Sequence, residues 1–209
     1  MASSKESGGR IRKKNKALIL NAAKTEFVTH GFKGASIKRI AERAEIPRAN
    51  IHYYFEDKTD LYQQLLTEII DTWNKNYDTF NEKDDPKEAL KSYIQSKVMY
   101  SRNEPEASRI FASEIIHGAP VLVDYLSGEF KEWVESKVAV INAWIDAGKI
   151  DAINPYHLLF LIWGSTQHYA DFNVQVLAAV GKKKLTKADY QEIADSVTGF
   201  VLKACGIKP

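Results

Sequence analysis

The stretch that most constrains the fold of this chain is SIKRIAERAEIPRANIHYYFEDK, residues 36–58. Its pattern predicts two short helices joined by a tight turn. Ser36 is a favourable N-cap, and apolar residues follow it at helical spacing through Ile40 to Ala44. Pro47 then opens the second helix, where its missing N–H costs nothing. We therefore expect a compact helix pair over this stretch.

The second helix of the pair presents a polar and aromatic outer face. At helical spacing, Arg48, Ala49, Asn50, His52 and Tyr53 point outward. Arg grips guanine bidentately, Asn grips adenine, and an alanine methyl meets the thymine methyl in the major groove. A small helix pair that ends in such a surface is typical of a helix-turn-helix, so the sequence predicts DNA binding.

The composition predicts an all-α protein of about nine helices. Hydrophobic residues make up 44% of 209, which is ample for a core, and no stretch alternates as strands do. The longest apolar run, Leu158–Trp163, is too short to span a bilayer. The single cysteine, Cys205, fits a reducing compartment, and no secretory segment is recognisable. We expect a cytoplasmic protein without a membrane anchor.

Charge divides the chain unevenly. Residues 1–58 hold 13 Lys and Arg against 6 Asp and Glu, whereas the remainder holds 16 against 21. The balance predicts a polyanion-binding N-terminal part on an acidic body. We expect residues 1–14 to form a flexible basic arm, with Lys13 and Lys14 on phosphates. Residues 15–60 would form the helix-turn-helix domain, and residues 61–209 a larger helical domain for ligand binding and dimerisation.

The segment FVTHGFKGASIKRIAERAEIPRANIHYYFEDKTDLY, residues 27–62, resembles the DNA-binding signature of the TetR family of transcriptional regulators. The resemblance implies that Arg48, Ala49, Asn50 and His52 face base edges. It also implies phosphate contacts, which fall on Ser36, Tyr53 and Lys58. The sequence departs from the family pattern at Pro47, where many relatives carry Ser, and at His52. These departures affect the detailed base contacts, not the fold.

A second informative stretch is HLLFLIWGSTQHYADF, residues 157–172. Its first half is apolar all round, which predicts a buried helix. Trp163 and Gln167 stand four residues apart and share one face, where an indole plane beside an amide suits a flat heterocycle. From spacing alone, two satisfied core residues are an equally good interpretation.

The segment SRIFASEIIHGAP, residues 108–120, and the stretch 157–172 are similar to the pyrimidine-responsive branch of the TetR family. The resemblance implies a ligand pocket that includes Trp73, Trp163 and Gln167, with uracil or thymine as effector. It further implies a repressor that binds a palindromic double-stranded DNA operator as a homodimer, through residues of about 155–178 and 187–204. The alternatives are another ligand class, or control by a protein partner without a small-molecule ligand.

An enzymatic or metal-binding interpretation is also open to the sequence. His168 and Asp171 stand three residues apart, as do Glu114 and His117, and such pairs can bind metal on helices. There is no HExxH, CxxC, GxSxG or glycine-rich phosphate loop. We therefore expect neither catalysis nor a metal or other cofactor, and interpret His168 as a hydrogen-bonded core histidine.

Overall fold

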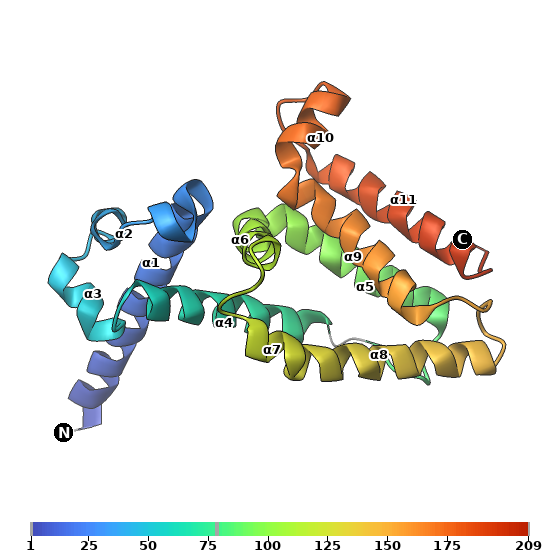
Figure 1. Cartoon of the computed structure of the whole chain (residues 1–209), viewed down its shortest axis with the longest axis horizontal. Helices are drawn as coiled ribbons and strands as arrows, with labels where there is room; N and C mark the ends of the chain where they lie inside the picture. The colour runs from blue at the N-terminus through green and yellow to red at the C-terminus, as the bar shows by residue number, and fades with distance from the viewer. Residues whose placement is uncertain (1, 78–79, 209) are drawn as a thin grey trace.

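The computed structural model describes residues 2–77 and 80–208, except for the side chains of residues 2–8 and 75–77. These residues form eleven α-helices and no strand (Figure 1), which confirms the all-α prediction. The N-terminal part comprises α1 (Ala2–Gly34), α2 (Ile37–Ala44), α3 (Arg48–Tyr54) and the start of α4 (Lys58–Tyr77).

The remaining helices form the larger body on the other side of Figure 1. Among them α5 is central, because it packs against α4, α6, α9 and α11. Their bounds are α5 Pro86–Asn103, α6 Pro105–Ile116, α7 Val123–Ser127, α8 Glu129–Asp146, α9 Pro155–Asp171, α10 Asn173–Val180 and α11 Lys187–Ala204.

The head, defined as residues 9–57, is built around a small apolar core. Ile19, Ala23, Phe27, Ile40 and Ile51 are buried there by at least 96%. Gly31 adopts φ 65° and kinks the end of α1 toward α2, which is a conformation that glycine adopts without steric cost. The predicted helix pair is present: α2 and α3 flank a turn in which Glu45 is left-handed.

The expectation of a flexible arm over residues 1–14 differs from the structure. The helix α1 begins at Ala2 and continues without a break through the basic residues. The segment contains no proline, and each residue added to an existing helix contributes one backbone hydrogen bond. Lys13 and Lys14 are nevertheless exposed, so the segment supplies positive charge from a helix.

Two apolar clusters fill the molecule. The first extends from the head along α4 to α6 and α7, and the second lies between α5, α8, α9 and α11. Trp73 on α4 and Tyr100 on α5 pack against both clusters. The helix α4 therefore joins the head to the body.

Helical stretches of the body are interrupted at two places. The helices α7 and α8 are separated at Gly128, whose φ and ψ of −105° and −106° are not helical. The range 155–178, which the resemblance implies for the dimer interface, is divided after Asp171, and the separate α10 projects beyond the body (Figure 1) and ends at Gly181 in a left-handed cap. No helix among residues 2–77 and 80–208 is long and apolar enough to cross a membrane.

Candidate functional site

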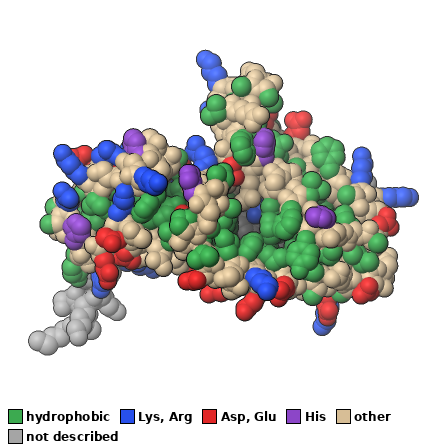
Figure 2. All heavy atoms as spheres, in the orientation of Figure 1, with side chains coloured by type: hydrophobic (Ala, Val, Ile, Leu, Met, Phe, Trp, Pro, Cys, Tyr) green, Lys and Arg blue, Asp and Glu red, His purple; other side chains and the backbone are tan. Residues whose placement is uncertain are grey.

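The recognition helix α3 exposes the residues that the sequence selected for base contact. Ile51 is 1% exposed and anchors the helix inward, while Tyr53 is 67% exposed. Pro47 stands at the N-cap position without a capping side-chain hydrogen bond. The other outward residues are all exposed, namely Arg48, Ala49, Asn50 and His52. Lys and Arg side chains gather on this lobe in Figure 2.

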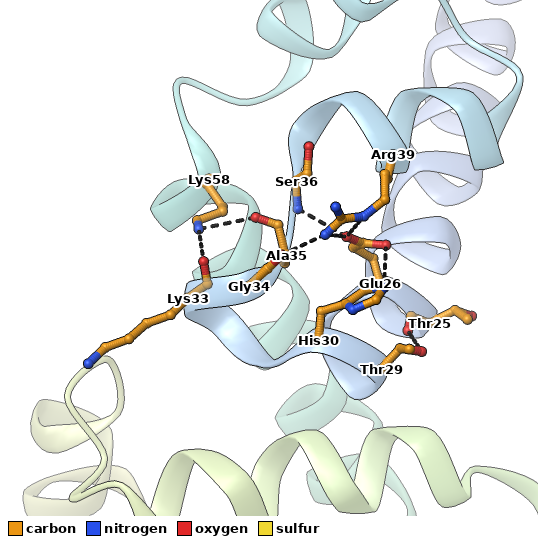
Figure 3. Close-up of polar contacts among 10 residues, drawn as sticks. All are labelled: Thr25, Glu26, Thr29, His30, Lys33, Gly34, Ala35, Ser36, Arg39 and Lys58. Atoms are coloured by element: carbon orange, nitrogen blue, oxygen red, sulfur yellow. Dashed lines mark hydrogen bonds and ion pairs between the residues drawn. The ribbon is translucent and has the colours of Figure 1, made fainter.

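Glu26 organises the turn that leads to α2, and no local pattern in the sequence marks it for this role. Its side chain is fully buried. Glu26 Oε1 accepts a hydrogen bond from the Ser36 amide at 3.0 Å and lies 2.7 Å and 2.6 Å from Nε and Nη2 of Arg39 (Figure 3). The carboxylate therefore holds the backbone of the N-cap residue Ser36 in place, while the Ser36 hydroxyl itself makes no capping hydrogen bond.

Lys58 supports the same turn from the first residue of α4. Its Nζ donates to the carbonyl oxygens of Ala35 at 3.2 Å and Lys33 at 3.4 Å (Figure 3). The same Nζ lies 4.8 Å from the ring centroid of Phe32. The ammonium thus compensates the carbonyl end of α1. Ser36 and Lys58, both predicted phosphate contacts, are half-buried at one edge of the head.

The basic N-terminal part of α1 lies against the recognition helix. The guanidinium of Arg12 is 5.6 Å from the ring centroid of Tyr53, and Asn15 Nδ2 donates to the Tyr54 hydroxyl at 3.2 Å. These contacts place the segment that carries Lys13 and Lys14 next to α3. Positive charge and the side chains predicted to contact bases therefore share one end of the head.

The body contains a pocket that brings together all three predicted ligand residues. It has a volume of about 90 Å³, is partly open, and is walled mainly by aromatic side chains. Figure 2 shows hydrophobic side chains gathered around a hollow near the middle of the face. The lining residues among those described are Trp73, Asn74, Tyr93, Lys97, Phe111, Tyr125, Phe130, Trp133, Trp163 and Gln167.

Hydrogen bonds and ring contacts hold the pocket walls in place. Trp163 Nε1 donates to the Tyr93 hydroxyl at 2.8 Å, which fixes the orientation of the indole. Burial raises the pKa of Tyr93, so this phenol stays neutral. Trp73 stands edge-on to Phe111, with ring centroids 4.4 Å apart. The walls therefore form a rigid slot that suits a flat ring.

Lys97 is the pocket residue that the sequence reasoning missed. It lies on α5, 9% exposed, in a stripe with Tyr93, Ile94 and Val98. A lysine within a buried helical stripe is rare enough to have marked the site in the sequence.

The pair His168 and Asp171 does not form a metal site. Asp171 accepts a hydrogen bond from Ser108 Oγ at 2.6 Å, and the ring of His168 stacks on Phe172. His168 is exposed, so the interpretation of it as a buried core histidine is wrong. Searched over the described part of the chain, no group of three His, Cys, Asp or Glu side chains is arranged to hold a metal ion.

Several large apolar side chains remain exposed on the last helices of the body. On α9 the exposed aromatic and aliphatic residues recur at helical spacing, and α11 adds one residue that is 68% exposed. These side chains fall within the ranges that the sequence selected for dimerisation. They are Tyr156, Phe160, Leu161, Phe172 and Phe200.

The head and body are joined by polar contacts as well as by α4. Lys24 Nζ on α1 forms an ion pair of 2.8 Å with Glu104, and Thr25 Oγ1 donates to Glu106 at 3.3 Å. Both partners stand at the start of α6, whose Phe111 lines the pocket. A head with an exposed basic and polar helix, joined by these contacts to a helical body that holds a pocket, is the arrangement typical of a DNA-binding transcriptional regulator.

Comparison with known families agrees with this class. Residues 19–65 match the family profile described as bacterial regulatory proteins, tetR family, and residues 66–208 match that of the YcdC-like protein, C-terminal region. The chain therefore belongs to the TetR family of transcriptional regulators.

Individual relatives refine the assignment. The chain is 40% identical over 194 residues to the HTH-type transcriptional regulator RutR of Escherichia coli strain K12, covering 93% of this chain and 91% of that protein. This similarity confirms the resemblance to the pyrimidine-responsive branch, whose members are regulators and not enzymes. The fold is shared with the putative transcriptional regulator SCO4942 of Streptomyces coelicolor, at a TM-score of 0.70 and 20% identity. The match covers 91% of this chain and 97% of that protein. It is also shared with AibR, solved with isovaleryl coenzyme A and operator DNA, at a TM-score of 0.67 and 17% identity. That match covers 89% of this chain and 97% of AibR.

Proposed function

We propose that this protein is a repressor that binds a palindromic operator as a homodimer and is released by a small flat ligand such as uracil or thymine. The observation that carries the proposal is the meeting of Trp73, Trp163 and Gln167 in one pocket. Trp163 would stack on the ring, and the Gln167 amide would pair with an imide edge. An engineered cavity of roughly 150 Å³ holds benzene, so a pocket of this size limits the ligand to a single ring.

At the other end, the proposed operator contacts fall on the exposed edge of the head. Arg48, Ala49, Asn50 and His52 would face base edges from α3. Phosphates would be held from the surrounding elements by Lys13, Lys14, Ser36, Tyr53 and Lys58.

Ligand and DNA would be coupled through α4 and α6. Trp73 and Phe111 line the pocket from these two helices, and both helices contact α1 of the head. A ligand that separates the two walls would shift the head relative to its partner in the dimer. A coupling free energy of typically 1–3 kcal/mol lowers operator affinity by roughly 5- to 150-fold.

Calorimetric titration tests the ligand, with a matched pair of variants. We expect uracil and thymine to bind the wild type, and Gln167→Leu to weaken binding by roughly tenfold or more because an imide edge loses its partner. The same change at the exposed Gln63 on α4 should leave ligand affinity unchanged. Absence of heat at millimolar uracil and thymine would exclude both as effectors, and unchanged operator affinity at saturating ligand would exclude induction.

A second experiment tests the basic end of α1. Replacing both Lys13 and Lys14 with alanine should reduce the slope of log affinity against log salt by up to about 0.9 for each phosphate that is no longer neutralised. The control is the double alanine variant of Lys183 and Lys184, which removes the same charge from the exposed loop after α10. The slopes are measured by fluorescence anisotropy. Equal slopes for the two variants would show that Lys13 and Lys14 do not contact DNA phosphates.

Control by a protein partner, without a small-molecule ligand, is favoured by no observation. That alternative predicts a filled core around Trp163 and Gln167, whereas both residues border a cavity of about 90 Å³.

A further inference from the structure

The pocket places a buried cation among aromatic rings. Lys97 lines it from α5, with Nζ 5.5 Å from the ring centroid of Trp73 and 6.0 Å from that of Tyr93. Both rings also line the pocket, so the ammonium borders the space that a ligand would fill. Aromatic faces attract a cation through their quadrupole, and this favours the charged form of the lysine.

The carboxylate that interacts with Lys97 belongs to a residue outside the pocket lining. Among the described lining residues there is no carboxylate; besides Lys97 they are aromatic residues, Asn74 and Gln167. Asp171 on α9, which is not a lining residue, interacts electrostatically with Lys97. Its carboxylate also accepts a hydrogen bond from Ser108 and interacts electrostatically with Arg109 and His168. The negative charge of Asp171 is thus shared among several groups, and Lys97 is the one charged side chain among the described lining residues.

Lys97 nevertheless remains a cation near neutral pH. Burial lowers its pKa to about 8, and the charge of Asp171 opposes this shift. Because the pKa stays above 7, most molecules carry the ammonium at pH 7 and lose it as the pH rises through 8. A buried ammonium is costly to desolvate, and an occupant that carries negative charge would offset that cost.

We propose that the pocket takes its effector as a planar ring anion, an acidic imide of the pyrimidinedione or pyrimidinetrione class, and that Lys97 selects it. The inference rests on the proposed function, since it names the chemical form of the ligand in that same pocket. Loss of a ring proton, from the imide N–H of a pyrimidinedione or from C5 of a pyrimidinetrione, spreads negative charge over the flanking carbonyl oxygens. One such oxygen pairs with the Lys97 ammonium while Trp163 stacks on the ring. Neutral uracil and thymine are then the weaker members of the class.

The consequence is an affinity order set by acidity. A 5-fluoro group withdraws electrons and makes the imide more acidic with little change in size, whereas it makes the neutral carbonyls poorer acceptors. Binding as the anion therefore predicts that 5-fluorouracil binds more tightly than uracil, by up to about tenfold for each pKa unit between the two ligands. Binding as the neutral imide releases no proton and does not tie affinity to acidity in this way. Barbiturate, which is already an anion at pH 7, should bind most tightly.

The experiment is calorimetric titration of the full chain at pH 7 with barbiturate, 5-fluorouracil, uracil and thymine. Each titration is run in two buffers of different ionisation enthalpy. We expect 5-fluorouracil to release close to one proton on binding and barbiturate almost none. These wild-type measurements decide the proposal even if variants fold poorly. Binding of all four without proton release, or in the reverse order, would overturn the inference and leave the proposed function intact. If none of the four ligands binds, both this inference and the proposed pyrimidine effector are refuted.

Substitution of Lys97 locates the selectivity. Lys97→Met keeps the length of the side chain, and should lower affinity for 5-fluorouracil by roughly 10- to 150-fold, because a hydrogen bond between charged groups is removed. It should also abolish proton release, and Lys97→Arg should retain the affinity order. The matched control is Lys137→Met on α8: Lys137 is also buried, donates to the Phe80 carbonyl at 3.1 Å, and does not line the pocket. An identical affinity order in Lys97→Met and wild type would show that Lys97 does not select the ligand.

Discussion

Leu161→Glu is expected to convert the protein into a monomer that binds its operator roughly 100- to 10,000-fold more weakly, because two linked half-site contacts become one. Leu161 is 50% exposed on α9, beside Phe160, which is also 50% exposed. An isologous interface brings the same patch of each subunit to the axis, so one substitution introduces two carboxylates. Their burial in an apolar contact has no compensating partner.

The control for this prediction is the same type of change at another exposed apolar residue. Ile116 at the end of α6 is 75% exposed and lies outside α9–α11. Ile116→Glu should leave both mass and operator affinity unchanged. Sedimentation equilibrium gives the oligomeric state, and binding to a full operator and to a single half-site gives the two affinities. A dimeric Leu161→Glu protein with full operator affinity would place the interface elsewhere.

The half-site measurement separates a dimerisation defect from a damaged head. The monomeric variant should bind an isolated half-site as well as one subunit of the wild type does, because α3 is distant from α9 in the fold (Figure 1). Recognition helices normally work in pairs on half-sites about one helical turn apart. Weak binding to both DNA lengths would instead indicate that the substitution unfolds the body.

Much of the head could be predicted from the sequence because its signals are local. The outward face of α3 follows from helical periodicity, and the kink at the end of α1 follows from Gly31. The buried Glu26 could not be predicted, since its partners Ser36 and Arg39 are brought to it by tertiary packing. Nothing in the spacing of these residues encodes that contact.

The pocket was partly predictable for the same reason. Trp163 and Gln167 share a helical face, so their proximity is local, whereas Trp73 was placed beside them only by the resemblance to a family. Lys97 carried a local signal as a charge in an apolar stripe. Its proximity to Trp73 depends on the packing of α4 against α5, which periodicity does not specify. The break between α9 and α10 was also not predictable, because it falls at Phe172 and not at a proline or glycine.

The second large effect is expected for Glu26→Ala, which should destabilise the head and weaken operator binding together. The substitution leaves the Ser36 amide without its acceptor and Arg39 without its carboxylate, and it opens a cavity beside α2. Loss of a partner for buried polar groups costs about 1–3 kcal/mol, and more when a charged pair is broken. Arg39 is 45% exposed and can regain water, so we expect a total loss of about 2–3 kcal/mol in the free energy of unfolding.

Two further variants show which part of the Glu26 contact matters. Glu26→Gln retains an oxygen that can accept from the Ser36 amide but removes the charge that holds Arg39, so its stability should fall between wild type and Glu26→Ala. Glu135→Ala removes an exposed glutamate that pairs with Lys131 at 3.8 Å, and should change stability by less than about 0.5 kcal/mol. Urea unfolding and operator binding are measured on all four proteins. If Glu26→Ala matches Glu135→Ala in both, the buried carboxylate does not hold α2 in place. If stability falls while DNA affinity is retained by the folded protein, the turn at Ser36 does not position a phosphate contact.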